Sequence, residues 1–103
     1  MEIKCKVGDY VGYIGKRDEK WKLTEDRINA VRLTKNNEVR LYFKNFRPLD
    51  HDEVIHNTEW LTGNNKVMLV QEPLLLTSEL RARVENWIEW ANENPDKATS
   101  IWK

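Results

Sequence analysis

The chain has 103 residues, the size of one domain, and its five Trp, three Tyr and two Phe are typical of a folded rather than a disordered sequence. The 17 basic and 17 acidic residues cancel, which argues against a protein whose whole surface binds or imitates nucleic acid. With one cysteine, no apolar leader segment and no apolar run long enough to cross a bilayer, we expect a cytoplasmic protein without membrane contact.

Extended segments dominate the beginning of the chain. Ile3, Cys5 and Val7 alternate with charged residues, which predicts a half-buried strand with Cys5 on its inner face. Residues 10–14 form a second apolar run, and Gly12 within it predicts a bulge or a close approach of another part of the backbone. This part of the chain is therefore expected to supply separate strands of one sheet.

A hairpin is predicted over residues 27–43, after a charged loop at residues 15–20. Residues 34–38 supply its turn, because Asn tolerates the left-handed backbone that such turns need. The apolar residues change parity between Ala30 and Val31. This change predicts a bulge where the strand turns the corner of a small barrel.

Helical signals begin in the second half of the chain. Asp50 and Glu53 have the spacing of a capping box, which predicts a single helical turn through about His56. Residues 67–70 are fully apolar and predict a short buried strand that ends before Pro73.

A longer helix is predicted over residues 77–94. Thr77 is placed to cap its start, apolar residues then recur at helical spacing, and the proline after Asn94 ends it. The order of elements predicts one α+β, mainly β domain over residues 1–103. Its parts are a small SH3-like antiparallel barrel with a helical turn (1–76), a C-terminal α-helix (77–94) and a tail (95–103).

Three segments together resemble a group of small uncharacterised proteins from phages and prophages of Gram-positive bacteria. The segments are VGDYVGYI at residues 7–14, the strand pair at residues 28–42, and VQEPLLLTSE at residues 70–79. The resemblance implies an SH3-like barrel with a C-terminal helix, in a protein that is carried by a mobile element and works in the cytoplasm of a bacterial host.

The predicted hairpin carries a run of cations on its outer face. Cations mixed with an aromatic ring suit a surface that follows the phosphates of a single strand, and small barrels often bind nucleic acid in this way. The same residue types are also ordinary on a solvated strand, where they discourage edge pairing. The candidate nucleic-acid-binding residues are Arg32, Arg40, Tyr42, Lys44 and Arg47.

A second candidate surface is acidic and aromatic. Residues 50–60 contain no Lys or Arg and would present carboxylates in place of phosphates to a basic groove. Tryptophan is enriched at the energetic centres of interfaces, although Trp102 is equally suited to folding back over Trp90 and closing the core. The candidate protein-binding residues are Asp50, Asp52, Glu53, Glu59, Trp60, Trp90 and Trp102.

Residues that would support catalysis or metal binding are sparse. Glu53 and His56 have the i, i+3 spacing of carboxylate-bridged metal helices, but no second copy of this motif occurs in the chain. Strand alternation turns Cys5 inward, away from the lysines that would lower its pKa. We therefore expect no catalytic residue, no metal and no cofactor.

These observations favour a non-enzymatic phage or prophage protein that acts by contact with a host or phage protein, such as a nucleic-acid-processing complex. An anti-defence inhibitor of the anti-CRISPR type, which blocks a host nuclease, is the concrete form of this hypothesis. The alternative is an SH3-like barrel that binds nucleic acid through the basic hairpin face. The sequence does not decide the oligomeric state.

Overall fold

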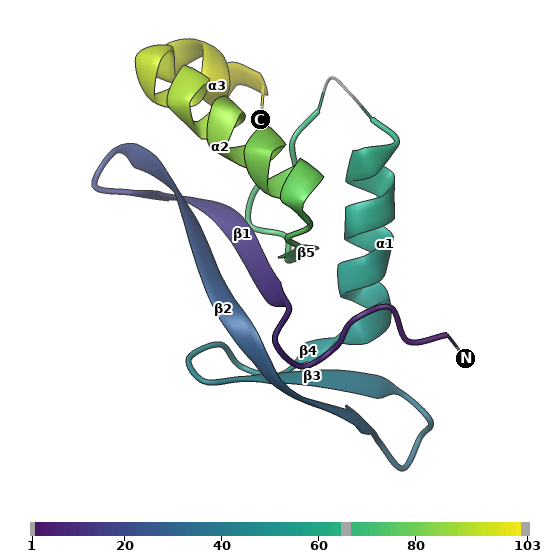
Figure 1. Ribbon diagram of the computed structural model, residues 1–103. Helices are drawn as coiled ribbons and strands as arrows, with labels where there is room; N and C mark the ends of the chain where they lie inside the picture. The colour runs from purple at the N-terminus through teal and green to yellow at the C-terminus, as the bar shows by residue number, and fades with distance from the viewer. Residues whose placement is uncertain (1, 65–66, 102–103) are drawn as a thin grey trace.

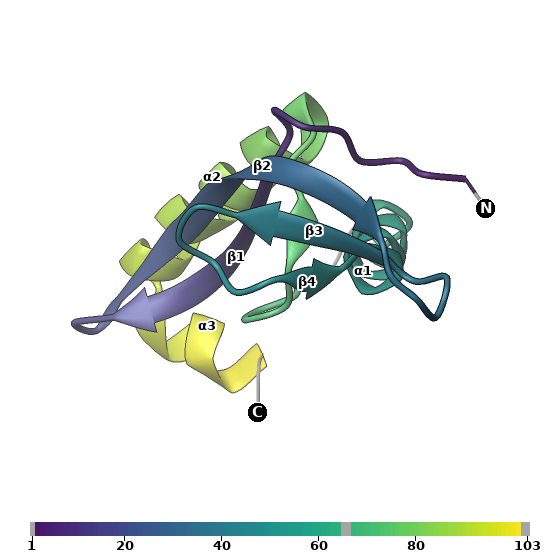
Figure 2. The same ribbon diagram turned by 90° about the horizontal axis from the view of Figure 1, so that it is seen from below.

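The computed structural model describes residues 2–64 and 67–101, which form an α+β fold around an antiparallel sheet (Figure 1). The sheet has five strands in the order β4-β3-β2-β1-β5 and curls into a half-barrel (Figure 2). In chain order the elements are β1 (Tyr10–Arg17), β2 (Lys20–Leu33), β3 (Val39–Phe43), β4 (Leu49–Asp50), α1 (His51–Thr62), β5 (Leu74–Leu75), α2 (Ser78–Glu93) and α3 (Pro95–Ile101).

β1 and β2 form one long antiparallel hairpin. Their pairing runs without interruption along all of β1 to a turn at Asp18 and Glu19. These two residues have φ angles of 53° and 65°, and such positive values fit a two-residue turn to the twist of the strands. The loop predicted at residues 15–20 is therefore wrong, because main-chain pairing continues through this charged segment almost to its tip.

A bulge divides β2 into two parts. The pairing with β3 shifts register between Ile28 and Ala30, so Asn29 is the extra residue. Ile28 is fully buried before the bulge, and Val31 packs against the same cluster after it. The predicted change of parity in this strand is thus confirmed, and the bulge lies slightly before the predicted position.

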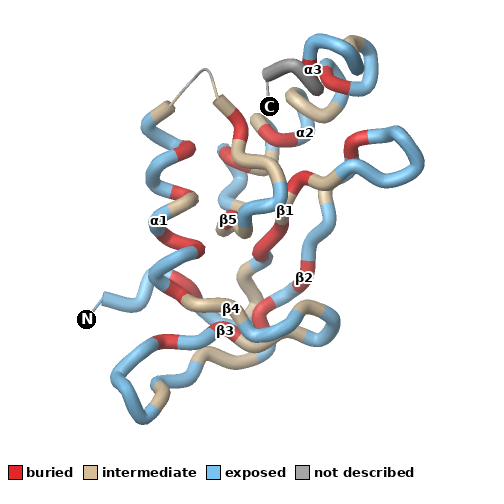
Figure 3. The backbone as a smooth tube through the Cα atoms, turned by 180° about the vertical axis from the view of Figure 1, so that it is seen from behind, coloured by how far each residue is buried: buried red, intermediate tan, exposed pale blue. Residues whose placement is uncertain are grey.

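The β1–β2 hairpin separates two apolar cores. Val11 and Ile14 of β1 are both fully buried, and their odd spacing places them on opposite faces of the strand. Ile14 belongs to the first core, with Leu80 and Val84 of α2, and Val11 belongs to the second, with Val54 and Ile55 of α1. Figure 3 shows in red the buried parts of each element. The first core contains Ile14, Trp21, Leu61, Met68, Leu74, Leu80, Val84, Ala91 and Ala98, and the second contains Cys5, Val11, Ile28, Leu41, Val54 and Ile55.

α1 is longer than the single turn that the capping box predicts. Asp50 caps the helix as expected, because its Oδ2 accepts the Glu53 N–H at 3.1 Å. The helix then continues to Thr62, since buried residues recur at helical spacing as far as Leu61. Polar residues and the exposed Trp60 cover the other face of α1, and they obscure this apolar stripe in the sequence.

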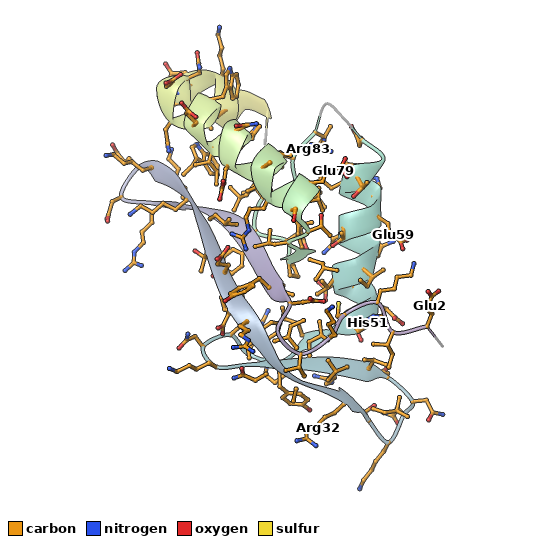
Figure 4. The ribbon with its side chains drawn as sticks, viewed as in Figure 1. Glu2, Arg32, His51, Glu59, Glu79 and Arg83 are labelled. Atoms are coloured by element: carbon orange, nitrogen blue, oxygen red, sulfur yellow. The ribbon has the colours of Figure 1, made fainter. Side chains whose placement is uncertain are left out.

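A side chain from another helix caps the C-terminal end of α1. Arg83 of α2 donates hydrogen bonds to the main-chain oxygens of Leu61, Asn64 and Val67 (Figure 4). α1 has no basic residue in its own last turn. The Arg83 guanidinium therefore supplies the positive charge that the dipole favours at this end of a helix.

The N-terminal segment lies against α1 without joining the sheet. Cys5 is buried as predicted, but Ile3 and Val7 are 52% and 55% exposed, and the strand predicted here is wrong. The Lys4 main-chain N–H donates to His51 Nε2 at 3.0 Å instead of to a neighbouring strand. A buried thiol and a buried imidazole thus hold the segment in place of a β-ladder.

The strand predicted at residues 67–70 is also wrong, and β5 forms after Pro73 instead. Residues 67–70 are irregular, with Met68 buried and an isolated bridge to β1. Gln71, with a φ of 65°, turns the chain before β5 begins. Pro73 then directly precedes the strand, where its missing N–H interrupts no ladder.

The last part of the described chain is helical. α2 begins after Thr77, whose Oγ1 accepts the Leu80 N–H at 3.2 Å, as the sequence predicts. The tail predicted at residues 95–103 is wrong at its start, because α3 directly follows α2. None of the helices in the described part of the chain has the length and apolar content needed to cross a membrane.

Gly12 is the site of a close approach, as predicted. A Cβ at this position would lie 2.8 Å from Leu76 Cδ1 and 2.9 Å from the Thr24 main-chain oxygen. Gly12→Ala should therefore lower the free energy of unfolding, measured in urea, by about 1–3 kcal/mol. Gly15→Ala is the control, because its Cβ would meet only Tyr13 Cε2 at 3.8 Å. An equal loss in both variants would show that crowding is not the cause.

Candidate functional site

The curled sheet leaves an opening between its two edge strands. A cleft of about 490 Å³ lies there, lined by Leu49 of β4 on one side and by Pro73, just before β5, on the other. We name it the seam cleft, and its other lining residues are Tyr13, Asn45, Phe46, Arg47 and Gln71. Among the described residues that line it, none is acidic.

A buried carboxylate positions the loop between β3 and β4 at the seam cleft. Asp26 is 8% exposed, and its Oδ2 accepts the N–H groups of Asn45 at 2.6 Å and Phe46 at 3.0 Å. Its Oδ1 accepts the Arg27 N–H at 2.9 Å. Burial raises the pKa of the Asp26 carboxyl, but these N–H donors and the Lys44 charge together lower it by more, to below the ordinary 3.8. Charge-assisted hydrogen bonds thus fix the loop.

Aromatic rings form one wall of the seam cleft. The Phe46 ring centroid lies 5.5 Å from that of Tyr13 and 5.4 Å from that of Phe43, with interplanar angles of 42° and 52°. Phe43 packs on the second core, whereas Tyr13 and Phe46 line the cleft. Because Asp26 fixes the main chain of Phe46, the rings offer a preformed apolar surface beside Arg47.

The structure places the predicted basic residues on two different surfaces. Arg32 and Arg40 lie opposite each other on β2 and β3, and Tyr42 lies beside them on the face away from the core residue Leu41. Arg32 points away from the body of the molecule (Figure 4). Of the predicted basic residues, Arg47 alone lines the seam cleft.

Most of the seam cleft was missed by the sequence analysis. Tyr13, Asn45, Phe46 and Gln71 come from segments that are distant in the chain, and the curl of the sheet brings them together. The available signal was that Phe46 directly precedes a cation in the loop after a strand. Lys44, which was predicted for this surface, is exposed near Asp26 and does not line the cleft.

The predicted acidic residues gather on α1, and several of them already bind groups of the protein itself. Asp50 caps the helix. Asp52 Oδ1 accepts a hydrogen bond from His51 Nδ1 at 2.9 Å. Glu59, which projects from the outer side of α1, forms an ion pair with Lys4 Nζ at 2.5 Å (Figure 4). The carboxylates of this segment are thus only partly available to a partner.

Exposed tryptophans lie on two different helices. Trp60 is 43% exposed, on the same solvent-facing side of α1 as Glu53. Trp90 of α2 is 37% exposed, and its ring centroid lies 6.4 Å from that of Trp87. Trp102 lies outside the described residues, so both predictions for it stay open. Trp60 therefore lies on the same helix as the predicted acidic residues, whereas Trp90 lies on a different helix.

The buried His51 side chain has a structural role. Its Nε2 accepts the Lys4 N–H, so Nδ1 carries the ring proton and donates a hydrogen bond to Asp52. Among the residues that the structure describes, no three His, Cys, Asp or Glu side chains converge on a possible metal position. Burial, together with the charge of Asp9, raises the pKa of the Cys5 thiol to about 11. The thiol is therefore protonated at neutral pH and is a poor nucleophile.

No family model, no curated protein and no solved structure matches the chain. The class of protein is thus defined by its fold and its cleft: a curled antiparallel half-barrel with an aromatic and cationic cleft at its open seam. The resemblance to phage and prophage proteins stays a prediction.

Asp26→Asn should remove a pH-dependent part of the stability. Because the folded pKa is lowered, the contribution of Asp26 is complete above the ordinary value of 3.8 and is lost as the pH falls through the lowered value. The urea midpoint of unfolding, followed by Trp fluorescence, should differ between the parent protein and Asp26→Asn, and this difference should become smaller below pH 3.8. Asp18→Asn, at an exposed position in the hairpin turn, is the control for the loss of one carboxylate charge. A difference of constant size for Asp26→Asn would contradict the role of its charge.

His51→Leu should loosen the N-terminal segment. The substitution keeps much of the buried volume but leaves the Lys4 N–H without its acceptor, which costs about 1–3 kcal/mol. Cys5 should then react with a thiol reagent at least about fivefold faster in the native protein. Lys4→Ala removes only an exposed ion pair with Glu59 and should change this rate by about twofold or less. Unchanged Cys5 reactivity in His51→Leu would rule out this role for the imidazole.

Proposed function

We propose that this protein is a non-enzymatic module that binds single-stranded nucleic acid in the seam cleft. The observation that carries the proposal is the contact of Tyr13 with Phe46 beside Arg47, in a cleft whose described lining residues include no acid. Proteins commonly bind unpaired strands by stacking bases on aromatic side chains while cations follow the backbone.

The size of the seam cleft favours an unpaired strand over a duplex. At about 490 Å³ it is comparable to a small-molecule pocket, which admits an exposed base but not a base-paired helix. The bases of an unpaired strand can turn outward and stack on protein side chains, whereas those of a duplex are covered by their neighbours. Asn45 and Gln71 each add an amide that can donate to and accept from the edge of such a base.

In this proposal the half-barrel is an SH3-like barrel with a C-terminal helical extension. The strand order supports it, because consecutive strands pair as a meander from β1 to β4 and β5 returns beside β1, as in a small barrel. An origin in a phage or prophage and a place in the bacterial cytoplasm belong to the same proposal. They rest on the resemblance of residues 7–14, 28–42 and 70–79.

A second proposal is that the protein inhibits another protein by contact, in the manner of an anti-CRISPR inhibitor of a host nuclease. The outer face of α1 favours it, because Glu53, Glu59 and Trp60 are exposed there and the helix contains no Lys or Arg. Such a face could replace the phosphates of a nucleic acid in a basic groove. It ranks second because Asp52 and Glu59 are already engaged within the protein.

Fluorescence anisotropy with a labelled single strand and the matching duplex, at several salt concentrations, tests the first proposal. The single strand should bind more tightly than the duplex, with an affinity that falls as the salt concentration rises. Phe46→Ala should weaken binding about fivefold or more, because stacking of a base is worth about 1–3 kcal/mol.

Arg47→Glu and Arg32→Glu are a matched pair of charge reversals. Arg47 lines the seam cleft, whereas Arg32 lies on the outer face of β2. Weaker binding in Arg47→Glu alone supports the seam cleft, and equal weakening in both variants would move the site away from it. If no strand binds at low salt, and a host protein is captured in a manner that Glu53→Lys or Trp60→Ala abolishes, the second proposal is favoured.

A further inference from the structure

The seam cleft continues into a second hollow on the β1–β2 hairpin. This hollow has a volume of about 500 Å³ and shares Tyr13 and Gln71 with the seam cleft. We name it the hairpin lobe. In the part of the chain that the structure describes, three cations line it, Lys16, Arg17 and Lys22, and no acidic residue does. The cationic character of the seam cleft therefore extends toward the tip of the hairpin.

The strand register shows which of these cations share the face of the seam cleft. Side chains alternate along a strand, so Arg17 lies on the same face of β1 as Tyr13. Lys22 is paired with Gly15 and lies on that face as well. Lys16 lies on the opposite face, where its Nζ is 5.7 Å from the centre of a tryptophan ring of the first core. The hairpin lobe thus presents two cations, Arg17 and Lys22, beside Tyr13.

The floor of the hairpin lobe is bare main chain on a well-held hairpin. Gly15 has no side chain, and a Cβ there would meet only Tyr13 Cε2 at 3.8 Å, so a ligand can approach this part of β1 closely. Asn92 of α2 accepts the Trp21 N–H at 2.7 Å and donates to the Trp21 carbonyl at 3.1 Å. These two hydrogen bonds fix the start of β2, and with it the strand that carries Lys22.

We propose that the hairpin lobe binds the phosphates of the same nucleic-acid strand whose bases enter the seam cleft. The inference rests on the proposed function and specifies its ligand, a strand that passes Tyr13 and Gln71 and follows the hairpin toward its tip. From Tyr13 to Arg17, β1 rises about 13 Å at about 3.3 Å per residue. This length spans about two to four nucleotides at a spacing of about 3.4 Å or more. Arg17 and Lys22 neutralise phosphates along it.

Oligonucleotide length separates the two parts of the site. The double variant Arg17→Glu/Lys22→Glu should weaken binding of a strand of about ten nucleotides at least tenfold, and that of a strand of about three nucleotides by less than about twofold. Each phosphate contact contributes about 0.7 to the salt dependence of single-strand binding. The plot of log K against log salt concentration has a negative slope, and for the longer strand the magnitude of this slope should therefore fall by about 1.4.

The matched control is Arg32→Glu/Lys35→Glu, which makes the same change of charge at the β2–β3 hairpin. Arg17→Lys/Lys22→Arg keeps both charges and should bind like the parent protein, and far-UV circular dichroism checks that each variant is folded. A loss that is equal for the two strand lengths, or equal in the control, would overturn the assignment of the hairpin lobe while leaving the seam cleft in place. Failure of the parent protein to bind either strand would overturn the proposed function as well.

Discussion

One extra residue in β2 determines how the rest of the chain is arranged. Before Asn29, the even-numbered side chains of Asp26 and Ile28 face the inside of the curl, and after it the odd-numbered Val31 does. A one-residue slip exchanges the two faces of a strand, so without the bulge Arg32 would be directed into the second core. The bulge also bends β2, and this bend helps to give the sheet the curl that brings its edges to one opening.

A helix, rather than further strand pairing, closes one end of the half-barrel. β4 and β5 contain two residues each, and these two edge strands do not pair with each other. The Leu75 N–H donates to Thr58 Oγ1 at 2.8 Å, and Asn57 Nδ2 donates to the Pro73 carbonyl at 3.2 Å. Side chains of α1 thus satisfy main-chain groups that another strand would satisfy in a closed barrel, and the seam cleft remains beside them.

Local patterns predicted the features that depend on consecutive residues and missed those that depend on the curl. The caps at Asp50 and Thr77 and the bulge near Ala30 each involve only a few neighbouring residues, so the sequence revealed them. No periodicity connects Tyr13 with Phe46, because their contact exists only after the sheet has curled and the buried carboxylate has fixed the loop. The predicted basic residues lie on two surfaces for the same reason. Side-chain alternation along β2 and β3 places most of these cations on the outer face of the sheet, whereas the curl encloses the inner face.

Arg83 joins the stability of α1 to that of α2. The Leu61 carbonyl in the last turn of α1 and the carbonyls of Asn64 and Val67 after it accept hydrogen bonds from Arg83, so they lose this partner whenever α2 leaves the sheet. α2 in turn packs on the β1–β2 hairpin through Leu80 and Val84 in the first core. Both helices and the hairpin are therefore expected to unfold in one cooperative transition, with local opening confined to the N-terminal segment and the exposed turns. Tyr13 lies on this hairpin, and Asp26 of the same hairpin accepts the Phe46 N–H. The aromatic wall of the seam cleft should therefore persist for as long as the protein is folded.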